Sequence, residues 1–146
     1  MLEANEMNLD AQWIVGFVDG EGCFHVGINQ NSEMTNGFQV LPEFTVVQHE
    51  RDIQVLYALK QYFGCGVVRM NHDTRQCFRV RKMEDLQGKI IPFFHKHPLK
   101  TRKSVDFYTF CRVINLMAQN EHLTVEGIEH IRSLAETMNR KGSYSC

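Results

Sequence analysis

The sequence lacks the hallmarks of a membrane protein and of a secreted, disulfide-rich protein. No apolar run approaches the about 20 residues of a membrane-spanning helix. The first six residues, Met-Leu-Glu-Ala-Asn-Glu, carry acids where a secretory signal peptide is basic. The five cysteines are scattered, with no Cys-x-x-Cys pair, so their pattern indicates neither a disulfide framework nor a zinc site. We therefore expect an intracellular protein with no membrane partner.

The chain also lacks internal repeats and low-complexity stretches. Its 146 residues are 43% hydrophobic and 23% charged, which is typical of a folded domain and not of a disordered chain. We expect residues 1–146 to form one domain with a single core, preceded by a flexible lead-in at 1–7 and followed by a flexible tail at 141–146.

The chain also lacks the net positive charge that is typical of nucleic-acid-binding proteins, because its formal net charge is −1. The charge is nevertheless polarised along the chain. The first 21 residues hold five acids and no Lys or Arg, whereas residues 69–103 hold ten Lys and Arg against three Asp and Glu, a net +7. A local positive charge of that size can attract DNA even when the net charge of the whole chain is not positive. The alternative is that these Lys and Arg residues only form a solvent-exposed face.

The stretch 13–24 is the most unusual in the chain. Its apolar residues surround a helix on almost every side, which predicts a helix buried all round. Gly16 and Gly20 are four residues apart, so they share one helix face and leave it open to the close approach of another backbone. The apolar residues of this helix are Trp13, Ile14, Val15, Phe17 and Val18.

Two carboxylates, Asp19 and Glu21, follow where this helix should end. A helix C-terminus carries partial negative charge and disfavours acids. Exposed helical carbonyls beside a carboxylate, however, are the hard oxygen ligands that a divalent cation prefers. The alternative is a buried helix with a purely structural role that ends at a glycine-rich turn.

The remaining elements follow from hydrophobic periodicity and turn residues. Residue Asn8 or Asp10 can cap the first helix. Pro42 implies an edge strand or a bulge, and Pro92 should end a short helix. The predicted helices are 9–19, 52–63, 84–91, 101–119 and 124–139, and the predicted strands are 24–30, 38–48, 67–70 and 75–81. This order predicts an α+β fold with a four-stranded antiparallel sheet.

Alternation along the strands predicts one face packed on helices and one open face. Strand 75–81 is the clearest case, because Phe78 and Val80 alternate with arginines. A sheet face rich in Arg, Gln and Asn can enter the major groove of DNA, where Arg reads guanine and Gln or Asn reads adenine. The predicted DNA-binding residues are His25, Asn29, Gln39, Thr45, Arg69, Arg75, Arg79 and Arg81.

The string Gly-Phe-Val-Asp-Gly-Glu-Gly at residues 16–22, followed by a strand-like Cys-Phe-His-Val-Gly-Ile, closely resembles the motif of the LAGLIDADG homing endonucleases. The resemblance implies an αββαββα fold with a concave DNA-facing sheet and hydrolysis of DNA phosphodiester bonds with Mg²⁺, or another divalent cation such as Mn²⁺. It implies an intron-encoded protein of a bacterial cytoplasm or an organelle. It leaves no role for a small-molecule substrate.

The resemblance also implies roles for single residues. Glu21 stands at the position of the metal ligand, with the Gly20 carbonyl as helper, and Asp19 should orient the helix ends. Gln48 matches the family's water-positioning glutamine. A basic residue at the start of the penultimate helix faces the scissile phosphate, and either Lys103 or Lys100 fits that description.

A single motif gives one active site per chain, and cutting both strands of a duplex takes two. The resemblance therefore implies a homodimer on a long, near-palindromic target, with a two-fold interface formed by Trp13, Gly16, Phe17 and Gly20. Two alternatives remain open. One is an RNA maturase that assists intron splicing, or a non-catalytic DNA-binding protein, on the same fold. The other is an unrelated α+β enzyme in which Glu21 has another role.

Overall fold

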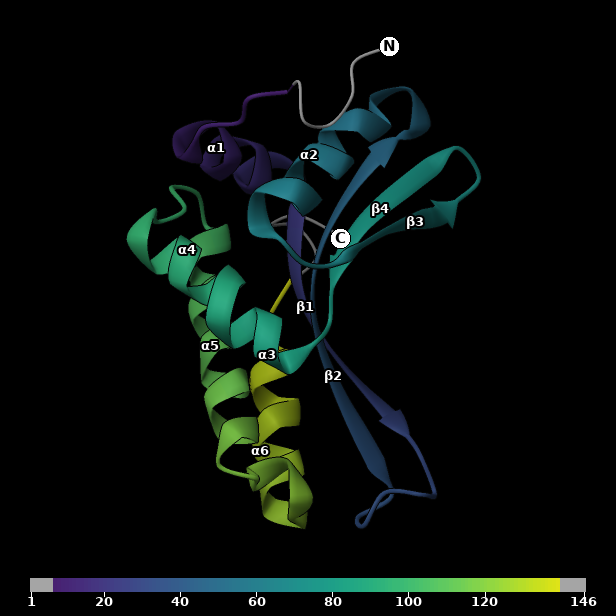
Figure 1. Ribbon diagram of the computed structural model, residues 1–146. Coiled ribbons are helices and arrows are strands. Elements are labelled where there is room, and N and C mark those ends of the chain that lie inside the picture. Colours follow the sequence, from purple (N-terminus) through teal and green to yellow (C-terminus); the bar gives the residue numbers. More distant parts are fainter. Residues whose placement is uncertain (1–6, 140–146) are drawn as a thin grey trace.

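The computed structural model describes residues 7–139 of the chain (Figure 1). The predicted tail and nearly all of the predicted lead-in lie outside these residues. The elements, in chain order, are α1 (Ala11–Glu21), β1 (Gly22–Gln30), β2 (Phe38–His49), a 3₁₀ turn η2 (Glu50–Asp52), α2 (Ile53–Phe63), β3 (Val67–His72), β4 (Arg75–Val80), α3 (Met83–Asp85), a π-helical turn η3 (Leu86–Ile90), α4 (Ile91–Lys96), α5 (Lys103–Ala118), a 3₁₀ turn η4 (Glu121–Leu123) and α6 (Val125–Ala135).

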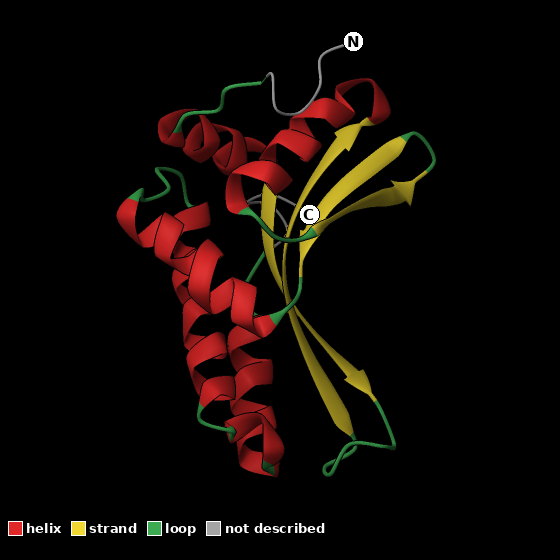
Figure 2. Ribbon diagram, viewed as in Figure 1, coloured by secondary structure: helices red, strands yellow, loops and turns green. Residues whose placement is uncertain are grey.

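The four strands form one antiparallel sheet in the order β1-β2-β4-β3. The predicted α+β class and the predicted sheet are therefore confirmed. Figure 2 shows the helices gathered on one side of the strongly twisted sheet, while the other side of the strands carries no helix among the residues described. The uncovered side is where the sequence places its arginines.

Aromatic packing between the sheet and the helices forms the core. Phe24 of β1 lies at its centre, with ring centroids 5.0–5.6 Å from those of four other phenylalanines. Such ring pairs add to the free energy gained from burying apolar area. The fully buried phenylalanines are Phe24, Phe44, Phe78, Phe94, Phe107 and Phe110.

The motif helix α1 begins and ends two residues later than the predicted helix 9–19. The side chain of Asp10 accepts a hydrogen bond from the backbone N–H of Trp13, which is an N-cap. The helix continues through Glu21, and the N–H of Gly22 donates to the carbonyl of Val18. The predicted end at residue 19 was too early, because Gly20 can extend a helix as well as end one.

The prediction from Pro92 was wrong, and the edge that Pro42 predicted exists only along part of β2. Pro92 does not end a helix: the wide turn at residues 86–90, where Ile91 donates its N–H to Leu86, continues directly into α4 with the proline in its first turn. That position needs no N–H donor. Pro42 lies in a central strand with no bulge, and it pairs with Val26. It is tolerated because β4 pairs with β2 only from Phe44 onward.

Between residues 7 and 139, every helix is too short or too polar to cross a lipid bilayer. Cys65, Cys77 and Cys111 are free thiols, as their irregular spacing predicted. Cys23 is disulfide-bonded, so the prediction from spacing was wrong for that residue.

Candidate functional site

The motif helix ends in a carboxylate that is open to solvent. Glu21 is the last residue of α1 and is exposed, and it forms no ion pair with any residue between 7 and 139. The neighbouring Asp19 is engaged instead. Its carboxylate accepts hydrogen bonds from the Thr101 hydroxyl (2.6 Å) and from the backbone N–H groups of Lys100 and Thr101 (2.9 and 3.1 Å). Asp19 therefore ties the end of α1 to the segment before α5.

Lys103 reaches the end of α1 from the first position of α5. Its Nζ donates to the Val18 carbonyl oxygen at 2.9 Å and to the Gly22 carbonyl oxygen, and the side chain is buried. Burial lowers the pKa of the Lys103 ammonium, and the charges of Asp19, Glu21 and Asp106 oppose that shift. Lys100, in contrast, is exposed on the loop. The structure thus places the side chain of Lys103, and not that of Lys100, among the atoms at the end of the motif helix.

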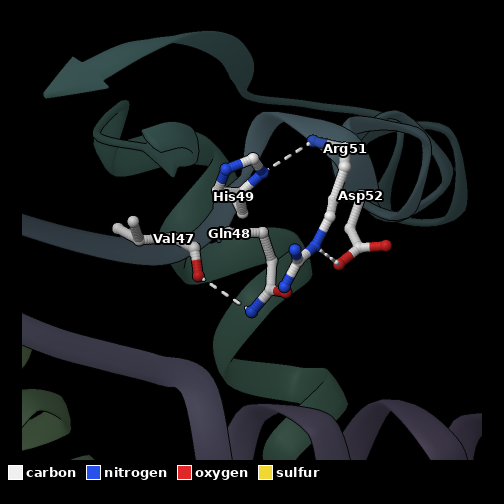
Figure 3. A network of polar contacts seen from close by, with 5 residues as sticks. All are labelled: Val47, Gln48, His49, Arg51 and Asp52. Atoms are coloured by element: carbon white, nitrogen blue, oxygen red, sulfur yellow. Dashed lines mark hydrogen bonds and ion pairs between the residues drawn. The ribbon is translucent and has the colours of Figure 1, made fainter. Parts of the chain in front are cut away.

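Gln48 lies at the same end of the sheet. Gly22 pairs with Val46 across β1 and β2, so Gln48 is two residues farther along β2, toward the junction of α1 and β1. Its amide donates to the Val47 carbonyl oxygen at 2.9 Å (Figure 3). Glu21, Gln48 and Lys103, which are distant in sequence, are brought to one region by the sheet register and by the start of α5.

The residues of this region suit a hard divalent cation in part. The exposed Glu21 carboxylate and the carbonyl at Gly20, in the last turn of α1, are oxygen donors of the kind that Mg²⁺ prefers. Within residues 7–139, no three His, Cys, Asp or Glu side chains gather closely enough to hold a metal ion. Mg²⁺ sites in proteins commonly have few protein ligands and take the others from water and phosphate oxygens.

The eight predicted DNA-binding residues share the uncovered side of the sheet, which we call the open sheet face. Cross-strand pairing places Asn29 beside Gln39 at one end and Thr45 beside Arg79 in the middle. A hollow of about 450 Å³ lies over this face. Six of the residues that line it are polar or charged residues of the open sheet face: His25, Glu43, Thr45, Arg69, Arg79 and Arg81.

Three arginines crowd this hollow and influence one another. The pKa of Arg79 is lowered, first by burial and then by the charges of Arg81 and Arg69, while the carboxylate of Glu43 opposes the shift. Glu43 lies on the same face of β2 as Thr45 but was not among the predicted DNA-binding residues, because an acid is not expected on a DNA-binding face. The one feature that could have indicated a role for Glu43 is strand register, which places it opposite the residue that follows β4.

Three of the four predicted dimer residues, Trp13, Gly16 and Gly20, are exposed on α1, whereas Phe17 is half-buried and packs partly against the core. Ile14, Val15 and Val18 are fully buried, whereas the Trp13 side chain is 43% exposed and stacks on Phe17 with ring centroids 4.8 Å apart. Gly16 and Gly20 are exposed, and a Cβ added at either would meet nothing within 4 Å. This side of the helix is therefore apolar, flat and open. The composition of α1 predicted a helix that is buried on every side. This prediction was wrong for residues 7–139, which leave this side of α1 exposed.

Comparison with known proteins identifies the motif. A family model described as LAGLIDADG endonuclease matches residues 14–114, more than two thirds of the chain. The chain belongs to the LAGLIDADG endonuclease family. The matched region starts on the LAGLIDADG helix α1 and ends within α5, so it contains Glu21, Gln48 and Lys103 together with the open sheet face.

Solved LAGLIDADG structures share the fold. The crystal structure of the homing endonuclease I-TnaI is similar with a TM-score of 0.89 and 56% identity, over 94% of this chain and 92% of that one. I-SmaMI, bound to an uncleaved DNA target in the presence of calcium ions, is similar with a TM-score of 0.89 and 35% identity, over 95% of this chain and 48% of that one.

A curated LAGLIDADG relative, the probable intron-encoded endonuclease 3 of Neurospora crassa, is 33% identical over 85% of this chain and 24% of its own length. The chain therefore spans about a quarter of that relative, about half of I-SmaMI and nearly all of I-TnaI.

Gly22, the last residue of the LAGLIDADG motif, allows a direct test of how the motif packs. A Cβ at Gly22 would lie 2.7 Å from Val18 Cγ1 and 3.1 Å from the Val18 carbonyl oxygen, which Lys103 also contacts. We expect Gly22→Ala to lower the free energy of unfolding by about 1–3 kcal/mol, measured by urea denaturation. The control is Gly88→Ala, because a Cβ at Gly88 meets nothing within 4 Å. Equal stability of the two variants would contradict the packing described.

Proposed function

We propose that this protein is a site-specific double-strand DNA endonuclease that depends on Mg²⁺ and acts as a homodimer. The observation that carries the proposal is the exposed Glu21 carboxylate at the end of the motif helix, close to the buried Lys103 ammonium and directly before β1, whose sheet carries an arginine-lined hollow on its open face. A protein that only bound nucleic acid would not need an exposed acid at a helix C-terminus, where it costs stability.

Each group has a defined part in this proposal. Glu21 and the Gly20 carbonyl hold the cation, which when bound supplies Lewis-acid activation of the phosphodiester and of the attacking water. Gln48 orients water near the scissile bond. Lys103 adds positive charge where negative charge develops on the phosphate, in a site where burial strengthens its field. The arginines of the open sheet face hold the duplex in register.

The proposed dimer follows from one motif per chain. I-SmaMI is about twice as long as this chain, whereas I-TnaI has nearly the same length. We infer that two copies pack through the apolar, glycine-bearing side of α1, which brings both Glu21 residues close to the dyad. The target is then near-palindromic, because a two-fold protein presents the same sheet to each half-site. Its gene is expected to lie in an intron, of an organelle or a bacterium.

The test is cleavage of a DNA duplex that is labelled on each strand. The duplex carries the sequence around the gene's own insertion point, without the inserted intron. We expect one cut on each strand with Mg²⁺ and none after removal of the metal with EDTA. Metal-independent binding with no cut on either strand would overturn the endonuclease and favour a maturase or a binding protein.

The two candidate lysines are distinguished by their positions in the structure. We expect Lys103→Ala to lower the cleavage rate by about 10²–10³, because it removes a preorganised positive charge. Lys100→Ala is the matched control and should change the rate by less than about threefold, since its side chain is exposed and only its backbone contacts Asp19. Single-turnover cleavage on one target measures both. Equal losses would show that Lys103 has no special role.

A further inference from the structure

The open sheet face carries one acid, Glu43, among arginines. In the described part of the chain, the residues that alternate onto this face from β1, β2, β3 and β4 include no other carboxylate. A carboxylate on a surface that meets DNA repels phosphates, and an ion pair as exposed as this one contributes little to stability. A role in recognition accounts for its position better than either of these effects.

Glu43 is paired with Arg81 in a specific way. The Arg81 Nε donates to Glu43 Oε2 at 2.6 Å, and the side chains are 47% and 18% exposed. Phe44 pairs with Val80, so Glu43 and Arg81 face each other one residue beyond the end of the ladder. Among residues 7–139, Oε1 of Glu43 and the two terminal nitrogens of Arg81 form no other hydrogen bond. Both side chains line the hollow of about 450 Å³.

This pair therefore leaves two donor nitrogens on Arg81 and one acceptor oxygen on Glu43 for a ligand. A G·C base pair presents the complementary series along its major-groove edge: guanine N7 and O6 are acceptors, and cytosine N4 is a donor. The ion pair fixes the plane of the guanidinium, and a fixed plane favours two parallel hydrogen bonds over a single contact with a phosphate.

We propose that Glu43 and Arg81 together read one G·C base pair in each half-site, Arg81 donating to guanine and Glu43 accepting from cytosine. The proposal rests on the proposed DNA-binding function of the sheet. It adds a specificity-determining acid that the charge of the face alone does not predict.

The experiment selects the preferred duplexes of the wild-type protein from a randomised library and then measures affinity for single base-pair changes. We expect G·C at one symmetric pair of positions, with a loss of about 5- to 150-fold when it becomes A·T. Glu43→Gln and Arg81→Lys should each reduce that preference at least about fivefold and leave other positions unchanged. Glu43→Gln should also bind unrelated DNA more tightly, because it removes a negative charge.

The control variant is Glu129→Gln, which removes the acid of another Glu–Arg pair, with Arg132 on α6. It should leave the whole sequence preference unchanged. If Glu43→Gln and Arg81→Lys keep the wild-type preference, or change affinity equally for every sequence, the proposed reading is wrong although the endonuclease stands. If the wild-type protein selects no sequence at all, both the reading and the proposed function fail.

Discussion

Replacing Glu21 by glutamine is expected to lower the rate of DNA cleavage by at least about a thousandfold. A bound metal supplies several kcal/mol of transition-state stabilisation, and each 1.36 kcal/mol is tenfold in rate. Glu21 is exposed and forms no ion pair with any residue from 7 to 139, so the substitution breaks no ion pair of the fold and removes only one of the charges that act on Lys103. The phosphate contacts of the open sheet face remain, and DNA affinity should stay within about threefold.

Single-turnover cleavage and a binding titration on the same duplex measure the two effects separately. Glu33→Gln is the matched control, since Glu33 is an exposed acid in the turn between β1 and β2. It should cleave like the wild type. A Glu21→Gln variant that retains its cleavage rate would show that Glu21 does not hold the metal.

Gly16→Leu is expected to separate the two chains of the dimer and to remove double-strand cleavage, with a loss of at least about a hundredfold. A Cβ on Gly16 meets nothing within 4 Å in one chain, so the leucine fits the monomer. Removing an interior glycine even favours the helix, by roughly 0.5–1 kcal/mol. In the dimer, the leucine stands between two α1 helices and moves both Glu21 carboxylates, and a shift of ~1 Å can cost about a hundredfold in rate.

Sedimentation velocity and strand-resolved cleavage check this expectation together. Gly88→Leu is the control, because a Cβ at Gly88 also meets open space, on a helical turn outside α1. The control should remain dimeric and active. A Gly16→Leu protein that is folded, dimeric and fully active would exclude this side of α1 from the interface.

Local patterns in the sequence predicted the parts of the fold that local physics determines. Alternation in residues 75–81 correctly placed the arginines on one side and Phe78 and Val80 in the core. Asp10, one of the two predicted candidates with Asn8, caps α1, and Thr124, the first residue of the predicted helix 124–139, caps α6, because an N-cap needs only a side-chain oxygen and a nearby N–H.

The features that the sequence did not predict depend on contacts between distant residues. The choice between Lys100 and Lys103 requires the contact of Lys103 with Val18, 85 positions away. The pairing of Glu43 with Arg81 requires the register of two strands 38 positions apart. The continuation of the helix past Pro92 depends on a π-helical turn, which sequence periodicity does not indicate.

In the proposed dimer, each chain contributes one Glu21 site, and we expect each site to cut one strand. The most direct measurement is cleavage by a mixed dimer of one wild-type chain and one Glu21→Gln chain, isolated through two different affinity tags and incubated with a plasmid that contains the target. We predict that the mixed dimer converts the supercoiled plasmid to the nicked circle and stops there, whereas the wild-type dimer produces the linear form. A mixed dimer that linearises the plasmid as fast as the wild type would contradict the claim.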